Sequence, residues 1–260
     1  MFVESREEQV LITVKTYPTP AHRGIEVSCT AGITAEGKWI RLFPIPFRFL
    51  DGSQQFKKYQ WIKVNVSKSS DPRPDSYKIQ TDSIEKIGPP LPTSNAWAIR
   101  KEIVLPTAAP SLCSLERERQ EGGPTLGVFK PRSVKRLIIT PERIKTWTEK
   151  ELEILSQLSM FDKSPSRQLE KIPYTFMYEF TCNEADCMGH KLSVTDWELG
   201  QSYRSWLASY GTKWEDQFRK KYELEMLLDR DLYFYVGTIR SHPHIWLIIG
   251  LFYPPKHENA

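Results

Sequence analysis

The sequence has no long hydrophobic run, since no apolar stretch approaches the roughly 18 residues of a membrane-spanning helix. The first residues, Met1–Glu8, are charged and lack the apolar core of a secretory signal. Cysteine is scarce, with four in 260 residues. These features predict a cytoplasmic protein without a membrane partner. In that reducing compartment, close cysteine pairs favour metal sites over disulfides.

Several familiar catalytic motifs are also missing. The chain contains no G-x-S-x-G elbow, no P-loop, no G-x-G-x-x-G and no H-E-x-x-H, and its Gly122-Gly123 pair is too short to cradle a phosphate. These absences argue against elbow-type serine hydrolases, P-loop NTPases, Rossmann dehydrogenases and HExxH metalloproteases. They leave open whether the protein is an enzyme.

What the chain does contain is typical of a globular protein with many short elements. It is 40% hydrophobic and 26% charged, with nineteen prolines and thirteen glycines. The net charge of +4 permits an anionic partner without requiring one. Aromatic residues reach 12%, including eight tryptophans, and such rings fill cores, line interfaces or stack on bases.

Hydrophobic patterning predicts an α+β fold with a β-rich N-terminal part. Closely spaced strands, including a hairpin around residues 35–37, indicate a small antiparallel sheet or barrel in a domain spanning 1–110. A connecting helical and basic segment is expected over 111–170, with a linker at 163–166. An α+β module is expected over 171–255, in the order strand, Cys/His loop, two helices and two strands.

The Cys/His loop carries the strongest chemical signal. Cys182, Cys187 and His190 lie within nine residues, and Gly189 can supply a tight backbone turn. Thiolates and imidazoles are ligands that Zn²⁺ selects, so the loop predicts a zinc knuckle.

A closed structural zinc site needs a fourth ligand, and we expect it from His242 or His244, in the turn between the last two strands. Asp186 is nearer but less suitable, because it lies inside the loop itself. Cys29 and Cys113 lack cysteine or histidine neighbours and are expected to be packed thiols. Two alternatives stay open: an unliganded loop with ordinary thiols, and a three-ligand site with a catalytic water.

Two carboxylates form a weaker candidate site. Asp196 and Glu198 could hold a cation for phosphodiester cleavage. They also fit a Thr195-Asp196-Trp197-Glu198 capping box, in which the two acids would stabilise a helix N-terminus without any catalysis. The capping role is the better interpretation.

Basic residues gather in two parts of the chain. One set alternates with aromatic residues in the N-terminal sheet, and the other lies between residues 130 and 145, where a single acid accompanies six basic residues. Such sets neutralise phosphates, although strand alternation also explains basic residues that are merely solvated. The candidate phosphate contacts are Arg41, Arg48, Lys130, Arg132, Lys135 and Arg136.

Together these patterns predict a nucleic-acid-binding protein with a structural zinc site, acting as a binding component of a larger assembly. One alternative is a metal-dependent hydrolase or nuclease acting on nucleic acid or a nucleotide. Another is a protein-interaction subunit whose aromatic surface meets a partner chain.

Overall fold

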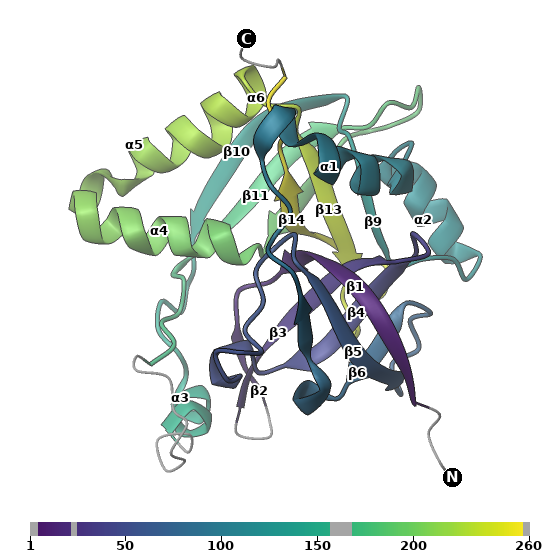
Figure 1. Cartoon of the computed structure of the whole chain (residues 1–260). Helices are drawn as coiled ribbons and strands as arrows, with labels where there is room; N and C mark the ends of the chain where they lie inside the picture. The colour runs from purple at the N-terminus through teal and green to yellow at the C-terminus, as the bar shows by residue number, and fades with distance from the viewer. Residues whose placement is uncertain (1–4, 22–24, 157–167, 257–260) are drawn as a thin grey trace.

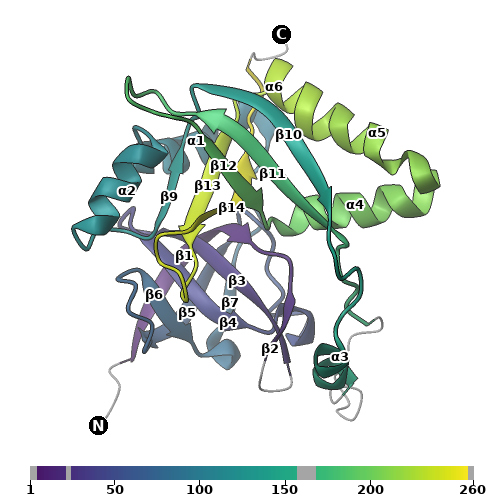
Figure 2. The ribbon, with the colours of Figure 1, turned by 180° about the vertical axis from the view of Figure 1, so that it is seen from behind.

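The computed structural model describes residues 5–21, 25–156 and 168–256 (Figure 1). Two seven-stranded sheets organise the chain. A barrel is built from the N-terminal part, and a second, mixed sheet is built from the remainder, with α2, α4 and α5 packed on one face and α1 and the barrel on the other (Figure 2). The predicted α+β class with a β-rich N-terminal part is confirmed. The expected linker at 163–166 lies outside the described residues.

The strands of the first sheet are β1 (Ser5–Lys15), β2 (Thr19–Ala21), β3 (Ile25–Thr34), β4 (Trp39–Ile45), β5 (Trp61–Lys68), β6 (Ser76–Ile79) and β7 (Glu85–Ile87). Five of them pair in the order β1-β3-β4-β6-β5, and β5 pairs back with β1, so the barrel is closed. All its pairs are antiparallel except β4–β6. The predicted hairpin corresponds to β3 and β4.

Strand alternation explains why the barrel has a core. Along β5, Ile62, Val64 and Val66 are buried, while the residues between them are half-buried. Successive side chains of a strand point to opposite faces, so every second residue of β5 faces the inside of the barrel, as the sequence indicates. Two short helices lie between these strands in the chain: η1 (Phe47–Phe49) between β4 and β5, and η2 (Thr81–Ser83) between β6 and β7.

The second sheet has the order β10-β11-β12-β14-β13-β9-β8. Its strands are β8 (Ala108–Ala109), β9 (Leu126–Phe129), β10 (Ser133–Pro141), β11 (Tyr174–Thr181), β12 (His190–Val194), β13 (Tyr233–Thr238) and β14 (Trp246–Phe252). Because β9 and β10 belong to this sheet, the segment expected over 111–170 as a helical and basic connector contributes strands to the second sheet. Short runs of four to nine residues gave too little pattern to assign their partners.

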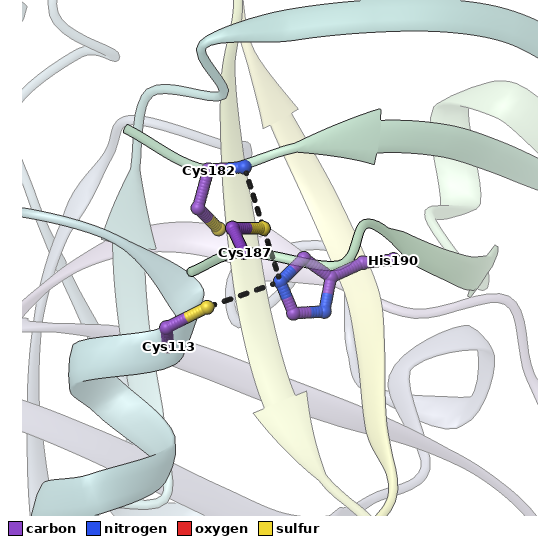
Figure 3. Close-up of side chains that lie close together, drawn as sticks. All are labelled: Cys113, Cys182, Cys187 and His190. Carbon is purple, nitrogen blue, oxygen red and sulfur yellow. Dashed lines mark hydrogen bonds between the residues drawn. The ribbon is translucent and has the colours of Figure 1, made fainter. Parts of the chain in front are cut away.

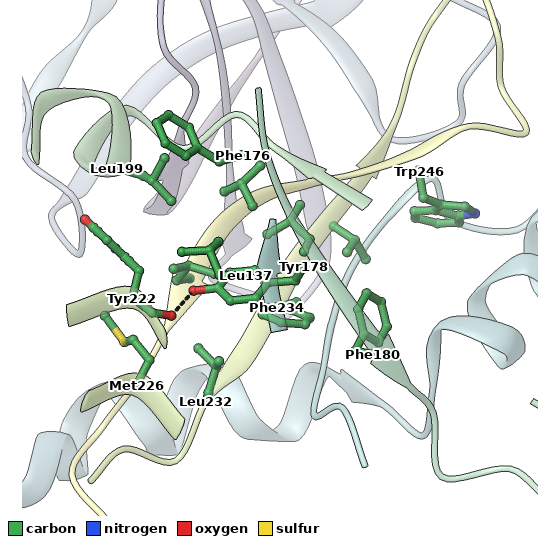
Figure 4. Close-up of a cluster of buried hydrophobic side chains, with 14 of the residues drawn as sticks. Leu137, Phe176, Tyr178, Phe180, Leu199, Tyr222, Met226, Leu232, Phe234 and Trp246 are labelled. Carbon is green, nitrogen blue, oxygen red and sulfur yellow. Dashed lines mark hydrogen bonds between the residues drawn. The ribbon is translucent and has the colours of Figure 1, made fainter. Parts of the chain in front are cut away.

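Helices complete the second part of the chain. They are α1 (Ser94–Val104), α2 (Leu112–Gln120), α3 (Glu149–Ser156), α4 (Trp197–Tyr210), α5 (Trp214–Arg219) and α6 (Met226–Leu228), with the short helices η3 (Leu105–Thr107), η5 (Gly211–Lys213) and η6 (Lys220–Glu225). Phe176, Tyr178 and Phe234 of the sheet pack with Leu199 and Tyr222 of the helical layer (Figure 4). No helix within the described residues is long and apolar enough to cross a membrane.

A second apolar cluster joins the barrel to the second sheet. Val14, Ala31 and Ile33 on the outside of the barrel pack with Leu126 and Val128 of the sheet. The outer surface of β3 is therefore buried. This contact fixes how the two parts of the chain sit against one another.

The helix α1 was not predicted, and its backbone shows why. Asn95, Ala96 and Trp97 all have positive φ angles, a left-handed conformation that non-glycine residues adopt rarely. Trp97 is buried and packs against Phe252, with ring centroids 5.6 Å apart. Tertiary packing, rather than helix propensity, therefore holds this segment.

Candidate metal centre

The predicted Cys/His loop connects β11 to β12. Gly189 has a φ of +91°, and a Cβ there would meet no atom closer than 3.6 Å. Glycine is thus favoured by the left-handed backbone rather than by lack of space. The N–H of Cys182 donates to Sγ of Cys187 at 3.2 Å. The loop therefore folds back so that its two ends meet.

Helix α2 is docked onto this loop through Glu184. Its carboxylate accepts a hydrogen bond from the hydroxyl of Ser111, the N-cap of α2, and forms an ion pair with Arg117 at 2.8 Å. Ser111 also accepts from the backbone N–H of Ser114 at 2.8 Å, as a helix cap should. These contacts bring the first turn of α2, and with it Cys113, against the loop.

Four side chains then converge on one point (Figure 3). The Sγ atoms of Cys113, Cys182 and Cys187 and a ring nitrogen of His190 all lie within 4.8 Å of one another. Nε2 of His190 is 3.3 Å from Sγ of Cys113 and 3.4 Å from Sγ of Cys187. Cys182 is buried and the other three are half-buried. This Cys₃His group could hold a metal ion.

The protonation of the group depends on its environment. Burial raises the pKa of the Cys113 thiol to about 12, and burial also raises the pKa of Cys182. Burial lowers the pKa of His190, so its imidazole is neutral and able to coordinate an ion at pH 7. Since metals bind the thiolate, an ion entering this group would displace thiol protons.

The prediction of the fourth ligand was wrong. Within the described residues, Cys113 joins the group, and His242 and His244 lie outside it. Nδ1 of His242 instead lies 2.9 Å from Oγ of Ser241. The turn that carries both histidines belongs to β13 and β14, whereas α2 is docked directly on the loop. Cys113 is 69 residues before Cys182, so local spacing gave no signal for it.

The candidate catalytic carboxylates are occupied by other contacts. Asp196, not Thr195, is the N-cap of α4, and its Oδ1 accepts from the backbone N–H of Glu198 at 2.7 Å. Nζ of Lys58 lies 3.4 Å from Asp196 and 3.2 Å from Glu198. Although burial opposes the charge of Lys58, the two carboxylates raise its pKa. An ammonium group thus stands where a catalytic cation would have to bind.

Two of the predicted phosphate contacts are turned into the protein. Arg41 is 2% exposed, and its guanidinium donates to Asp75 at 2.8 Å and to the hydroxyl of Thr125 at 2.9 Å. Arg48 forms an ion pair with Glu26 at 2.9 Å, and its side chain is 17% exposed. The prediction for Arg41 was therefore wrong, because the second sheet covers the side of the barrel that carries it.

The four predicted basic residues beyond position 129 are exposed. Lys130 pairs with Asp231, while Arg132 lies just before β10. Lys135 and Arg136 both pair with Glu179 at 2.8 Å, and their side chains are 70% and 56% exposed. A groove of about 480 Å³ is lined by Lys135, Arg136, Glu179 and Lys191, together with residues of the metal loop. The lining also includes His190 of the Cys₃His group.

Two family models match the chain. Residues 108–260 match a family described as Domain of unknown function (DUF8757), which covers more than half of the sequence. The chain belongs to the DUF8757 family. Residues 6–106 match a second family, described as Domain of unknown function (DUF8758). The DUF8757 range begins at β8, the first strand of the second sheet, and contains all four residues of the Cys₃His group. No curated protein matches the chain.

Proposed function

We propose that this protein binds nucleic acid through the groove beside the Cys₃His group, and that a structural Zn²⁺ ion supports one wall of that groove. Lys135, Arg136 and Lys191 would contact phosphates. The observation that carries the proposal is that His190 belongs to the donor group and to the groove lining. The ion would therefore stabilise the surface that binds.

The donor set supports zinc. Three thiols and one imidazole are the ligands of structural zinc sites, which are tetrahedral and closed. Four protein donors leave no position for a reactive water, so the role we propose for the ion is structural. All four cysteines are free thiols, which fits a reducing compartment, and we therefore propose a cytoplasmic location.

The charges that line the groove favour an anionic polymer as the ligand. Lys135, Arg136 and Lys191 place three cations around one acid, Glu179, on adjacent strands. Lysine and arginine neutralise phosphates and release counterions. Met188, at the rim, is 97% exposed and offers an apolar contact for a base or sugar.

The barrel is a less suitable binding surface. In OB-folds, which are also five-stranded barrels, the face of the second and third strands binds oligonucleotides. Here the corresponding strands, β3 and β4, contribute Ala31, Ile33 and Arg41 to buried contacts with the second sheet. The hydrolase alternative is disfavoured for a similar reason, because Lys58 neutralises Asp196 and Glu198.

The test combines elemental analysis with binding of a fluorescent 12-nucleotide DNA or RNA between 50 and 200 mM KCl. Over this fourfold range of salt, three phosphate contacts change the affinity by roughly one to two decades. We expect about one zinc ion per chain and affinity that falls steeply with salt. The double variant Lys135→Gln/Arg136→Gln should lower affinity and reduce the slope of log K against log salt by about 2, or about 1 per lost phosphate contact.

The matched control removes two exposed cations from the barrel, Lys57→Gln/Lys78→Gln. It should retain the slope and affinity of the unaltered protein. Equal losses in both double variants would point to nonspecific attraction to net charge. A salt-independent response, or no binding to any oligonucleotide, would overturn the proposal.

A further inference from the structure

A hollow lies between β12 and β14, next to the Cys₃His group. These strands are parallel neighbours, but within the described residues their ladder contains the single pair Val194 and Ile248. Toward His190 and Trp246 the strands therefore lack ladder partners on this side. The space there measures about 560 Å³ and is lined by residues 190–193 and 244–247, with α2 contributing Leu112, Cys113 and Glu116.

The walls of this hollow have the composition of a ligand pocket. The lining is mostly apolar and includes Leu192, Ile245 and the largely buried Trp246, while Lys191, Ser193 and His244 add polar groups. Pockets for small ligands are typically 300 to about 1,000 Å³ and combine mostly apolar walls with a few polar groups. The lining is thus suited to a flat, partly apolar group that carries or adjoins an anion.

The negative charge in the hollow is already neutralised. The carboxylate of Glu116 accepts from Arg119 at 2.8 Å and from the indole Nε1 of Trp246 at 2.8 Å. Hydrogen bonds from Arg119 are the largest cause that lowers the pKa of Glu116 to about 2. Glu116 therefore helps to fix Trp246 in the wall, and Lys191 remains the nearby cation for a phosphate.

The hollow and the basic groove share two lining residues, His190 and Lys191. The two spaces therefore adjoin at the start of β12, with Lys135 and Arg136 bordering one and Leu192 and Trp246 bordering the other. A ligand that fills both spaces is a polymer rather than a single mononucleotide. A base can enter the hollow only if it is unstacked and unpaired, as in single strands.

We infer that the hollow between β12 and β14 receives one unpaired nucleotide of a single-stranded nucleic acid, while neighbouring phosphates lie on Lys135, Arg136 and Lys191. The inference rests on the proposed function and narrows its ligand from nucleic acid in general to a single strand. The base lies against the apolar side of the hollow, which includes Leu192. The hydroxyl of Ser193 belongs to the same lining and can bond to the edge of the base.

The experiment compares a 12-nucleotide single strand with a hairpin duplex of equal charge, by fluorescence anisotropy at fixed salt. We expect the single strand to bind about tenfold or more tightly, the effect of one stacked base. Replacing one base at a time by an abasic site should weaken binding strongly at one position of the bound register. The phosphates are unchanged in this series, so only a base pocket produces that result.

A variant then fills the hollow. Ser193→Phe should remove most of the preference for the single strand while zinc content and salt dependence persist. Ser67→Phe makes the same change on β5 of the barrel, where Ser67 is also half-buried, and should keep the preference. If Ser193→Phe does not fold, as judged by circular dichroism and zinc content, the abasic series decides.

The possible failures are distinguishable. Equal affinity for single strand and duplex, a flat abasic series, or a preference that survives in folded Ser193→Phe would overturn this inference and leave the proposed function intact. Absence of salt-dependent binding to both oligonucleotides would overturn the proposed function itself.

Discussion

Two basic residues of the barrel region and two of the second sheet are used in opposite ways. In the barrel, Arg41 and Lys58 point into the contact with the second sheet and bind carboxylates and backbone oxygens there. On β10, Lys135 and Arg136 remain exposed around Glu179. Two segments with similarly basic sequences thus differ in the structure. In the barrel these residues hold the two parts of the chain together, and on β10 they form a charged surface.

This difference limits what a pattern of basic residues in a sequence can predict about an exposed surface. A basic residue on a half-buried strand faces either solvent or another layer of the protein, and alternation alone does not distinguish them. The presence of a covering layer decides the outcome. The contrast between the two regions is open to tests by substitution.

The largest effect is expected from Cys113→Ser, which removes one of four donors. The zinc content should fall from about one ion per chain to nearly none. The free energy of unfolding in excess zinc should fall by at least about 4 kcal/mol, the equivalent of about a thousandfold loss of ion binding. Hydrogen exchange should rise in α2 and the metal loop and stay low in β1 and β5.

Cys29→Ser provides the matched control, because Cys29 lies on β3, outside the metal-binding group. It should retain the ion. Retention of zinc in Cys113→Ser would show that the helix α2 does not supply a ligand, and loss of barrel protection would contradict the contrast between the regions.

Arg41→Met should have the next largest effect. It leaves the buried carboxylate of Asp75 without its cation, although Thr125 still donates to it at 2.6 Å. We expect the free energy of unfolding to fall by about 3 kcal/mol in urea titrations. Arg136→Met changes an exposed arginine and should cost less than about 0.5 kcal/mol. A stable Arg41→Met protein with weakened nucleic-acid binding would mean that Arg41 contacts the ligand and does not stabilise the fold.

The buried carboxyl group of Glu26 should make the stability of the barrel depend on pH. Burial, partly opposed by Arg48, raises its pKa from 4.5 to about 6. The folded state then holds this proton more tightly than the unfolded state, so its contribution to stability is largest below pH 4.5 and declines as the pH rises through 6. Glu26→Gln should abolish this decline.

The stability of Glu26→Gln relative to the unaltered protein should therefore increase with pH, by about 2 kcal/mol between pH 4 and 8. Urea titrations at several pH values measure it. Glu121→Gln changes an exposed acid and should show no such trend. A gain that is equal at all pH values would indicate that Glu26 is not the titrating group.

The smallest effect concerns the exposed surface. Glu179→Gln frees Lys135 and Arg136 from their ion pairs and should raise oligonucleotide affinity by up to about fivefold, or about 1 kcal/mol. Glu85→Gln removes one of the two carboxylates that pair with Lys63 on the barrel and should leave affinity unchanged. Weaker binding in Glu179→Gln would mean that Glu179 contacts the ligand favourably.

The features that the sequence predicted well are those with a local cause. The hairpin of β3 and β4 and the converging loop of Cys182, Cys187 and His190 both follow from neighbouring residues. The features that it missed depend on contacts between distant segments. Cys113 reaches the metal group through the docking of α2 on the loop, to which Glu184 contributes its contacts with Ser111 and Arg117.

The contacts of Lys58 also bear on the order in which the chain is made. Its partners are Asp196, Glu198 and the carbonyl of Leu251, which leave the ribosome long after the barrel strands. Chains are synthesised from the N-terminus, and early domains begin to fold while later ones are still being added. The newborn barrel must therefore keep this ammonium hydrated until β14 has emerged, because only then are all three partners of Lys58 present.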